Sequence, residues 1–370
     1  NFYLPPQISW VSPAQGSELG GYQVTIHGTD FNNIQGSIRC KFNSTLSPST
    51  AVYVNSTYAV CTSPAYPLYD NGLSIDPSTG SIVNPPTATL LLELSFNDGV
   101  DYTSNHVQYR YLPTPNITAI VPRAGSVLGG TIITVMGSNF IPTSFLTCFF
   151  NLNTSSLPAG SSTLSVAAVY VSSTQLTCQS PDVHSFFSGP LIDPNTDTQF
   201  PILLSIANSA IDPNQIVLQS AEYIYYAQPV VVSLYLSRGS SAGGAVVRVD
   251  GSFFNNITGD IRCRFGSIES PRFAYYINST QIECLAPQQV NGTVEVEIAF
   301  NSFDYTANHV EFVVTPQPIV NAIYPRSGPI TGSTPVTVFG DNFFASPGWP
   351  CRFQSNSSLS APARRPLLCC

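Results

Sequence analysis

Nine cysteines are the residues whose type and spacing most clearly support chemistry in this sequence. They fall as one pair in each of four successive stretches of chain: Cys40 with Cys61, Cys148 with Cys178, Cys263 with Cys284, and Cys351 with Cys369 or Cys370. Disulfides are the favoured interpretation, and a metal site or buried free thiols are the alternatives. No Cys-x-x-Cys occurs and only 4 His are present, so we expect disulfides and an extracellular or cell-surface location. For the ninth cysteine three possibilities stay open: it is free, it is joined to a second chain, or it lies at a processed end.

Three further patterns resemble sites of catalysis or metal binding. Gly239-Ser240-Ser241-Ala242-Gly243 has the form of a hydrolase nucleophile elbow, which also needs a strand, a helix, and His and acid partners. Asp193-Pro-Asn195-Thr-Asp197 has the opening spacing of a calcium loop without its Gly and distant Glu. His106 and His309 occupy the same place in two repeats, which favours a structural role, and His27 has no ligand pattern around it. We therefore predict no enzyme, no cofactor and no metal site.

Eight Asn-x-Ser/Thr sequons mark candidate glycosylation sites at Asn43, Asn55, Asn116, Asn153, Asn256, Asn278, Asn291 and Asn356. Asn55 and Asn278 are equivalent, because each opens Asn-Ser-Thr ahead of the second cysteine of a pair. Aromatic residues make up 11% of the chain, and we expect them mostly in the core; exposed surfaces on which sugars stack are the alternative for a few of them.

The composition excludes several classes of protein. Hydrophobic residues reach 43%, which excludes a disordered chain, while charged residues are only 9% against roughly a quarter in most soluble domains. The net charge of −8, with Lys41 as the single lysine, predicts no binding to nucleic acid. No apolar run reaches the roughly 18 residues of a membrane span, and we expect that no signal peptide remains at Asn1. The polar surface must come from Ser, Thr, Asn, covalent glycan, or burial in an assembly.

Four repeated segments account for nearly the whole chain. Each starts with a proline before a short apolar stretch, at Pro6, Pro115, Pro229 and Pro318. Each passes through a Gly-bounded turn to Gly-x-x-Phe, at Gly28, Gly137, Gly251 and Gly340. Each then reaches Cys-x-Phe at the first cysteine of its pair, and the first three continue to Cys-x-x-Pro, at Cys61, Cys178 and Cys284. Agreement at every landmark identifies an internal repeat.

These segments predict an all-β protein made of tandem immunoglobulin-like β-sandwiches, three complete and one partial. Short alternating strands rich in Val, Ile, Thr, Tyr and Phe are separated by turns, and 31 Pro and 25 Gly leave no room for long helices. We expect repeat 1 over residues 1–113, repeat 2 over 114–227, repeat 3 over 228–316 and a partial repeat 4 over 317–370. Repeats 1 and 2 each carry an insertion with Ile-Asp-Pro, at Asp76 and Asp193.

The combination of Pro-x-x-Gly, Gly-Gly, Val-Thr-Ile-x-Gly-x-x-Phe, Cys-x-Phe and Cys-x-x-Pro resembles the IPT/TIG domain. This immunoglobulin-like module occurs in plexins, growth-factor receptors and many microbial and protist surface proteins, and also in Rel-type transcription factors. The resemblance implies the fold over nearly the whole chain, but it does not select a function. The acidic charge and the paired cysteines disfavour the transcription-factor branch.

Two non-enzymatic functions are compatible with the sequence, and the first is the one that we predict, with the second as the alternative. In the first, the chain is an extracellular glycoprotein that assembles head-to-tail with copies of itself into a filament or coat. Phe2, Tyr3 and Leu4 resemble the last strand of repeat 1 and would complete repeat 4 of the next subunit, with help from Cys370. In the second, the chain belongs to the ectodomain of a cell-surface receptor or adhesin that binds a protein or a glycan. We expect covalent glycans in either case, and no membrane insertion in this segment.

Overall fold

The computed structural model describes residues 4–32, 38–43, 48–66, 87–152, 163–187, 199–208, 220–343, 350–353, 359–364 and 368–369, with the backbone alone at 186–187 and from 350 onward. The chain divides into two compact units. The first consists of Asn1–Ile192 and Thr198–Gln228, and the second includes Pro229–Cys370. Nearly every described element is a strand, so the predicted all-β fold is confirmed.

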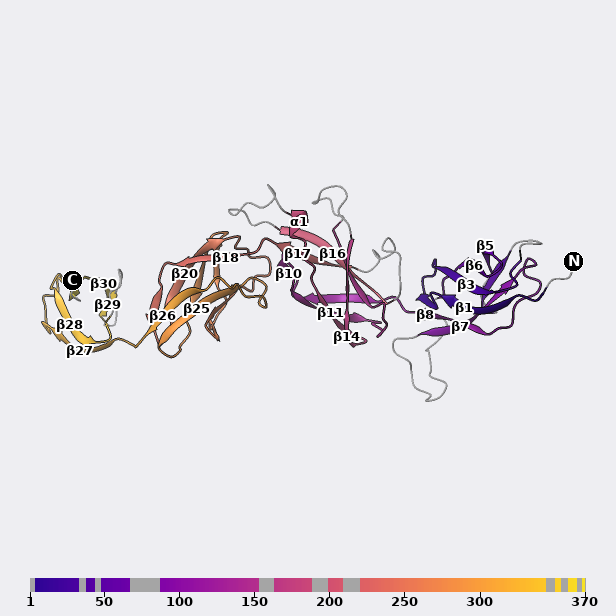
Figure 1. Ribbon diagram of the computed structural model, residues 1–370. Coiled ribbons are helices and arrows are strands. Elements are labelled where there is room, and N and C mark those ends of the chain that lie inside the picture. Colours follow the sequence, from indigo (N-terminus) through magenta and orange to yellow (C-terminus); the bar gives the residue numbers. More distant parts are fainter. Residues whose placement is uncertain are drawn as a thin grey trace, which may run out of the picture. The chain divides into compact units, whose positions relative to one another are not determined.

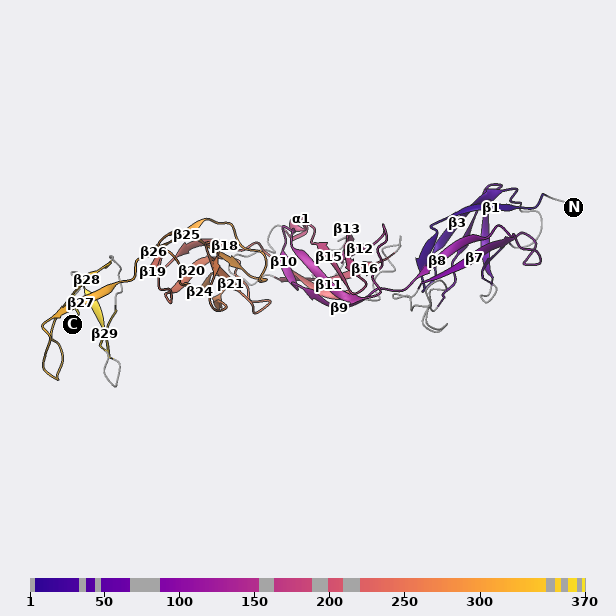
Figure 2. The ribbon, with the colours of Figure 1, turned by 90° about the horizontal axis from the view of Figure 1, so that it is seen from below.

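Repeat 1 consists of strands β1 (Gln7–Ser12), β2 (Gln15–Ser17), β3 (Gln23–Thr29), β4 (Arg39–Phe42), β5 (Ser49–Asn55), β6 (Tyr58–Thr62), β7 (Ala88–Ser95) and β8 (Val107–Leu112). Their order in the sheet is β1-β3-β6-β5-β4-β7-β8-β2. Strand β5 pairs first with β4 and then with β6, and so joins the two layers of the sandwich. Figure 2 shows β1 and β3 in one layer and β7 and β8 in the other.

Repeat 2 has the same plan as repeat 1, with two separate sheets. Its elements are β9 (Asn116–Val121), β10 (Ala124–Ser126), β11 (Ile132–Ser138), β12 (Thr147–Asn151), β13 (Thr163–Ala167), β14 (Val169–Ser172), β15 (Gln175–Gln179), α1 (His184–Phe187), β16 (Gln199–Ala207) and β17 (Ser220–Tyr226). One sheet has the order β14-β15-β11-β9 and the other β10-β17-β16-β12-β13. The short helix α1 was not indicated by the sequence, which lacks a helical period there.

Repeat 3 consists of β18 (Val230–Leu234), β19 (Arg238–Ser240), β20 (Val246–Ser252), β21 (Arg262–Phe265), β22 (Ile268–Glu269), β23 (Tyr275–Asn278), β24 (Gln281–Leu285), β25 (Gly292–Ala299) and β26 (Val310–Thr315). Its sheets have the orders β18-β20-β24-β23 and β19-β26-β25-β21-β22. Repeat 4 forms one sheet, β27-β28-β31-β30-β29, from β27 (Ile319–Tyr324), β28 (Val336–Asp341), β29 (Pro350–Phe353), β30 (Leu359–Arg364) and β31 (Leu368–Cys369). Figure 1 labels most of these strands.

The Gly-x-x-Phe landmark exists because the backbones of two paired strands and a phenylalanine ring come very close together there. In repeat 1 a β-carbon on Gly28 would overlap the carbonyl oxygen of Gln7 on β1 and the ring of Phe31. Gly137, Gly251 and Gly340 have the same surroundings in their own repeats. Only glycine lets the strand and the phenylalanine ring approach this closely, so the motif is a requirement of packing.

Alternation along the strands builds one apolar core in each complete repeat. In repeat 1, Val24 and Ile26 on β3 are fully buried, whereas Thr25 and His27 between and beside them face outward. In repeat 3, Val247 and Val249 on β20 are fully buried in the same way. The residues on the inner faces are therefore constrained by the fold, and the residues on the outer faces can differ from one repeat to another.

Candidate interaction surfaces

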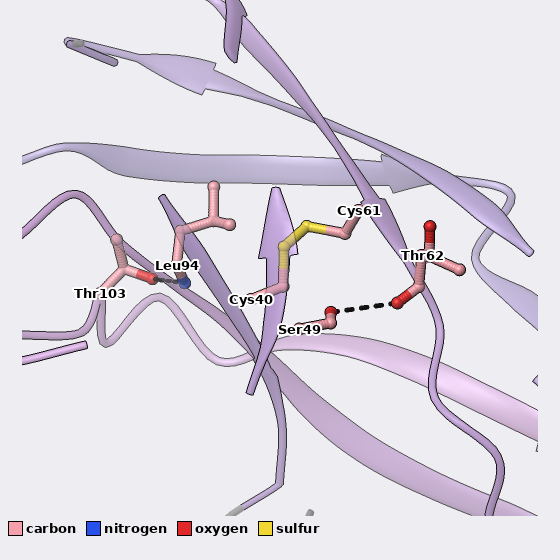
Figure 3. Close-up of a disulfide and its surroundings, with 6 residues drawn as sticks. All are labelled: Cys40, Ser49, Cys61, Thr62, Leu94 and Thr103. Carbon is pink, nitrogen blue, oxygen red and sulfur yellow. Dashed lines mark hydrogen bonds between the residues drawn. A yellow bond between two sulfur atoms is a disulfide. The ribbon is translucent and has the colours of Figure 1, made fainter. Parts of the chain in front are cut away.

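Three disulfides join the two layers of the three complete repeats. They are Cys40–Cys61, Cys148–Cys178 and Cys263–Cys284, as the sequence predicts. In repeat 1 the bond links β4 to β6, as Figure 3 shows. Close to it, the Thr103 hydroxyl accepts a hydrogen bond from the Leu94 amide at 3.0 Å. All six of these cysteines are buried, which is the environment of structural disulfides.

The remaining cysteines belong to repeat 4. The backbones of Cys351 and Cys369 lie in β29 and β31, and Cys369 is the register partner of Val336 on β28. The side chains of both cysteines, and all of Cys370, lie outside the described residues. The pairing predicted for them therefore stays a prediction.

The structure places six of the eight candidate glycosylation sites. Asn55, Asn256, Asn278 and Asn291 are exposed, and Asn43 and Asn116 are half-buried. Asn153 and Asn356 lie outside the described residues. Asn55 and Asn278 end equivalent strands, β5 and β23, and occupy the same position in the turn that follows.

The residues proposed for head-to-tail assembly are mostly not described. Phe2 and Tyr3 lie outside the described residues, as does Cys370. Leu4 is described and has 68% of its side chain exposed, outside any strand.

The motifs that resemble catalytic or metal sites have structural explanations or are not described. Gly239 and Ser240 lie in β19, which pairs in parallel with β26 and leads into a turn, not into a helix. The segment from Asp193 to Asp197 lies outside the described residues. Among the described residues, no group of three or more His, Cys, Asp or Glu side chains is placed to hold a metal ion.

An exposed apolar edge recurs in the three complete repeats. It is formed by β5, β14 and β23, which share the pattern Ala-x-Tyr-x-x-Ser-Thr, starting at Ala51, Ala168 and Ala274. Strands β14 and β23 each end a sheet, and β5 pairs with β4 only at Ser49 and Thr50, so that its remaining residues pair with β6 on one side. Val52 and Val169 are 65% exposed, and Tyr275 is 69% exposed. An apolar strand with an open edge is the type of surface that pairs with another strand.

The outer face of one sheet in repeat 3 concentrates charged and aromatic side chains. Arg264 on β21 pairs with Glu297 on β25, and its guanidinium lies 4.1 Å from the ring centre of Tyr305. The Tyr305 hydroxyl donates a hydrogen bond to Glu269 at 2.7 Å, and Arg262 donates to the same carboxylate at 3.0 Å. The Tyr305 hydrogen bond, followed by Arg262, lowers the pKa of Glu269. Burial and then the Glu269 carboxylate raise the pKa of Tyr305 to about 12.

Repeat 1 has a smaller version of this charged face, and the described residues of repeat 2 have an uncharged pair at the matching positions. In repeat 1, Lys41 pairs with Glu93 at 2.7 Å and lies 4.3 Å from the ring centre of Tyr102. At the matching register positions of repeat 2, Phe149 faces Ser205. These differences make the outer faces, not the cores, the candidates for separate interactions.

Neither surface was predicted from the sequence. The exposed edge has a signal in the sequence, because the pattern Ala-x-Tyr-x-x-Ser-Thr occurs once in each of the three complete repeats. A comparison of the repeats at these positions would have found it. The charged face depended on the pairing of β21 with β25, whose residues are more than thirty positions apart in sequence.

Two curated relatives are similar in sequence to part of this chain. Human fibrocystin-L is 28% identical over 235 residues, which are 62% of this chain and 5% of fibrocystin-L. Plexin A3 of Danio rerio is 22% identical over 295 residues, which are 76% of this chain and 13% of that protein. The chain thus spans only a small part of the length of these relatives.

Among solved structures, the full extracellular region of plexin A4 is similar, with 14% sequence identity and a TM-score of 0.37. The match covers 96% of this chain and 33% of the plexin A4 chain.

No helix within the described ranges has the length and apolar character that crossing a bilayer requires.

Residues 6–111, 115–210, 229–314 and 318–360 each match the IPT/TIG domain family. These four segments cover most of the chain and contain the glycine, phenylalanine and cysteine landmarks of the four repeats. The chain therefore belongs to the IPT/TIG domain family, which it repeats four times in tandem.

Proposed function

We propose that this chain is an extracellular segment of a large cell-surface receptor or adhesin that binds a ligand and has no catalytic activity. The observation that carries this proposal is the tandem series of four IPT/TIG domains in this chain, together with its similarity to fibrocystin-L over 62% of its length and to plexin A3 over 76%. Three disulfides support an oxidising, extracellular compartment, and glycans at the exposed sequons belong to the same proposal. These relatives favour the receptor over the head-to-tail filament, for which no comparison gives support.

The binding surface in this proposal is the open edge of β14 in repeat 2. Val169, Tyr170 and Val171 are exposed side by side along it. The equivalent edges in repeats 1 and 3 end in the sequons at Asn55 and Asn278, where a glycan would shield the strand. Strand β14 ends in Ser172 instead and has no sequon there.

The partner of this edge is an extended segment of an extracellular protein ligand, which adds as a further strand beside β14. Backbone hydrogen bonds provide affinity in such a complex, and alternate side chains provide selectivity. The exposed valines would contribute apolar contact area at the centre of the interface.

The test is binding of the secreted, fluorescently labelled chain to a panel of cultured cells, measured by flow cytometry over a concentration series. We expect saturable binding that Ser172→Asn weakens by at least about tenfold, because this change creates Asn-Ser-Thr and places a glycan on the edge. The matched control is Ser172→Asn combined with Thr174→Ala, which lacks the sequon and should bind normally. Absence of saturable binding, or equal loss in both variants, contradicts the proposed surface.

Negative-stain electron microscopy of the same secreted protein separates the two functions. A receptor segment gives dispersed single particles at every concentration tested. Regular filaments would favour the structural assembly and overturn the receptor.

A further inference from the structure

The outer face of repeat 1 carries a row of three stacked aromatic rings. Trp10 on β1 and His27 on β3 lie with ring centres 3.7 Å apart and planes only 8° from parallel. The Tyr58 ring on β6 follows at 5.8 Å from His27, with an angle of 29° between the planes. Trp10 remains 53% exposed, so the stack lies at the surface and not in the core.

The row continues to a fourth residue, Asn55. The strand register pairs Trp10 with His27, His27 with Tyr58, and Tyr58 with Asn55. These strands are adjacent in the order β1-β3-β6-β5. Residues paired in this way have β-carbons about 5 Å apart on the same face of the sheet. A group attached to Asn55 would therefore be the next member of the stack.

Asn55 opens a sequon and its side chain is held in one orientation. Its Oδ1 accepts hydrogen bonds from the Thr57 amide, the Thr57 hydroxyl and the Tyr58 amide, at 2.8, 2.7 and 3.0 Å. No described residue accepts a hydrogen bond from Asn55 Nδ2. The carbonyl end of this exposed amide is thus bound to the turn, and the nitrogen remains for attachment of a sugar.

The aromatic row is not a requirement of the fold, because repeats 2 and 3 lack it. The matching row of repeat 2 consists of Ala119, Met136, Gln175 and Ser172. The matching row of repeat 3 consists of Ser233, Asp250, Gln281 and Asn278. Repeat 3 thus keeps the sequon, with Asn278 Oδ1 bound to Thr280 in the same way, but has polar side chains in place of the rings.

We propose that Asn55 carries an N-linked glycan whose first N-acetylglucosamine packs against Tyr58 and extends the stack of Trp10, His27 and Tyr58. The flat apolar face of a pyranose ring suits an aromatic ring, and Asn55 lies one strand spacing, ~4.8 Å, from Tyr58 in the register. Thr25, two positions before His27 on β3, and Thr57, whose hydroxyl is bonded to Asn55, are uncharged and suit the polar rim of a sugar.

The attachment uses a lipid-linked oligosaccharide diphosphate as donor. A bond forms between Asn55 Nδ2 and the anomeric carbon C1, while the bond from C1 to the diphosphate oxygen breaks. The amide nitrogen loses one proton, and the lipid diphosphate leaves with the bonding electrons. No oxidation or reduction takes place.

This inference rests on the extracellular location in the proposed function but not on its ligand. The test is the rate at which a peptide N-glycosidase releases the glycans at Asn55 and Asn278 from the folded, secreted full chain, followed by glycopeptide mass spectrometry. We expect release at Asn55 to be about fivefold slower than at Asn278, because the stacked sugar must detach first. After denaturation and reduction, the two rates should become equal.

Tyr58→Gln introduces the residue that repeat 3 has at this position, and it should remove most of the difference while the disulfides stay intact. Trp10→Ser, at the far end of the stack, should have a smaller effect and serves as the matched control. Equal release rates in the unmodified protein, or an unoccupied Asn55 beside an occupied Asn278, would overturn the inference alone. If neither asparagine carries a glycan, the inference is wrong, whereas the extracellular location still rests on the disulfides.

Discussion

Repeats 1 and 3 have nearly the same interior and different outer faces. Phe42 packs edge-on against Tyr109 in repeat 1, and Phe265 packs edge-on against Phe312 in repeat 3, each pair with ring centres 5.2 Å apart. Outside, repeat 1 has a stack of aromatic rings where repeat 3 has Ser233, Asp250 and Gln281. Packing thus keeps the inner residues of the two repeats similar, while the outward residues of the same strands differ.

The largest expected effect is a loss of core packing that is equal in the two repeats. Phe42→Ala and Phe265→Ala each remove a fully buried ring, and each should cost about 3–5 kcal/mol of unfolding free energy in its own repeat. Hydrogen exchange measured on peptides from each repeat would locate the loss. A small effect in one repeat and a large effect in the other would show that the interiors are not equivalent.

Removal of a disulfide should have the next largest effect. The cysteines of repeats 1 and 3 are separated by the same 21 positions, so Cys40→Ala/Cys61→Ala and Cys263→Ala/Cys284→Ala should each cost roughly 3 kcal/mol. Denaturant unfolding of each variant, monitored by peptide-resolved hydrogen exchange, measures the two losses. Unequal costs would indicate that one bond is strained or that one repeat depends on its neighbours.

At alkaline pH the interior of repeat 1 should lose stability through a buried tyrosine that the interior of repeat 3 lacks. Burial raises the pKa of Tyr109 from its ordinary value of 10.0 to about 12, whereas repeat 3 has Phe312 at this position. A raised pKa in the folded state contributes stability that is present below pH 10 and is lost as the pH rises toward 12. For Tyr109 the loss amounts to about 2–3 kcal/mol.

Tyr109→Phe introduces the residue that repeat 3 has at this position. It should therefore reduce the loss of stability of repeat 1 between pH 10 and 12. Stability at pH 7 should change little, and thermal unfolding at a series of pH values measures both. An unchanged alkaline decline in this variant would assign the decline to other groups, such as Tyr111, whose pKa burial also raises.

The smallest effect on stability is expected for the outer row. Trp10→Ser removes one ring of the exposed stack and should cost about 0.5–1.5 kcal/mol. Thermal unfolding at neutral pH measures this change. A cost as large as that of Phe42→Ala would mean that the stack belongs to the core.

The sequence predicted the repeated interior because its requirements are local. Gly28 and Phe31 lie three positions apart, and the cysteine pairs recur at fixed places in each repeat, so the turns, strands and disulfides could be expected directly. The family resemblance then followed from these same positions.

The outer surfaces could not be predicted because they depend on register between distant strands. Trp10, His27 and Tyr58 lie 17 and then 31 positions apart, and only the pairing of β1, β3 and β6 brings them together. His27 in particular has no neighbouring pattern in the sequence that suggests a function. Strand β5 added a further difficulty, because it changes from one layer to the other within seven residues.

The most direct test of independent outer faces is to transfer the aromatic row to repeat 3. Ser233→Trp, Asp250→His and Gln281→Tyr together reproduce the row beside Asn278 without altering a core residue. The account predicts that release of the Asn278 glycan by peptide N-glycosidase slows about fivefold, to the rate seen at Asn55, while the thermal stability of repeat 3 stays the same within ~1 kcal/mol. Unfolding of repeat 3, or an unchanged rate of release in a folded variant, would contradict it.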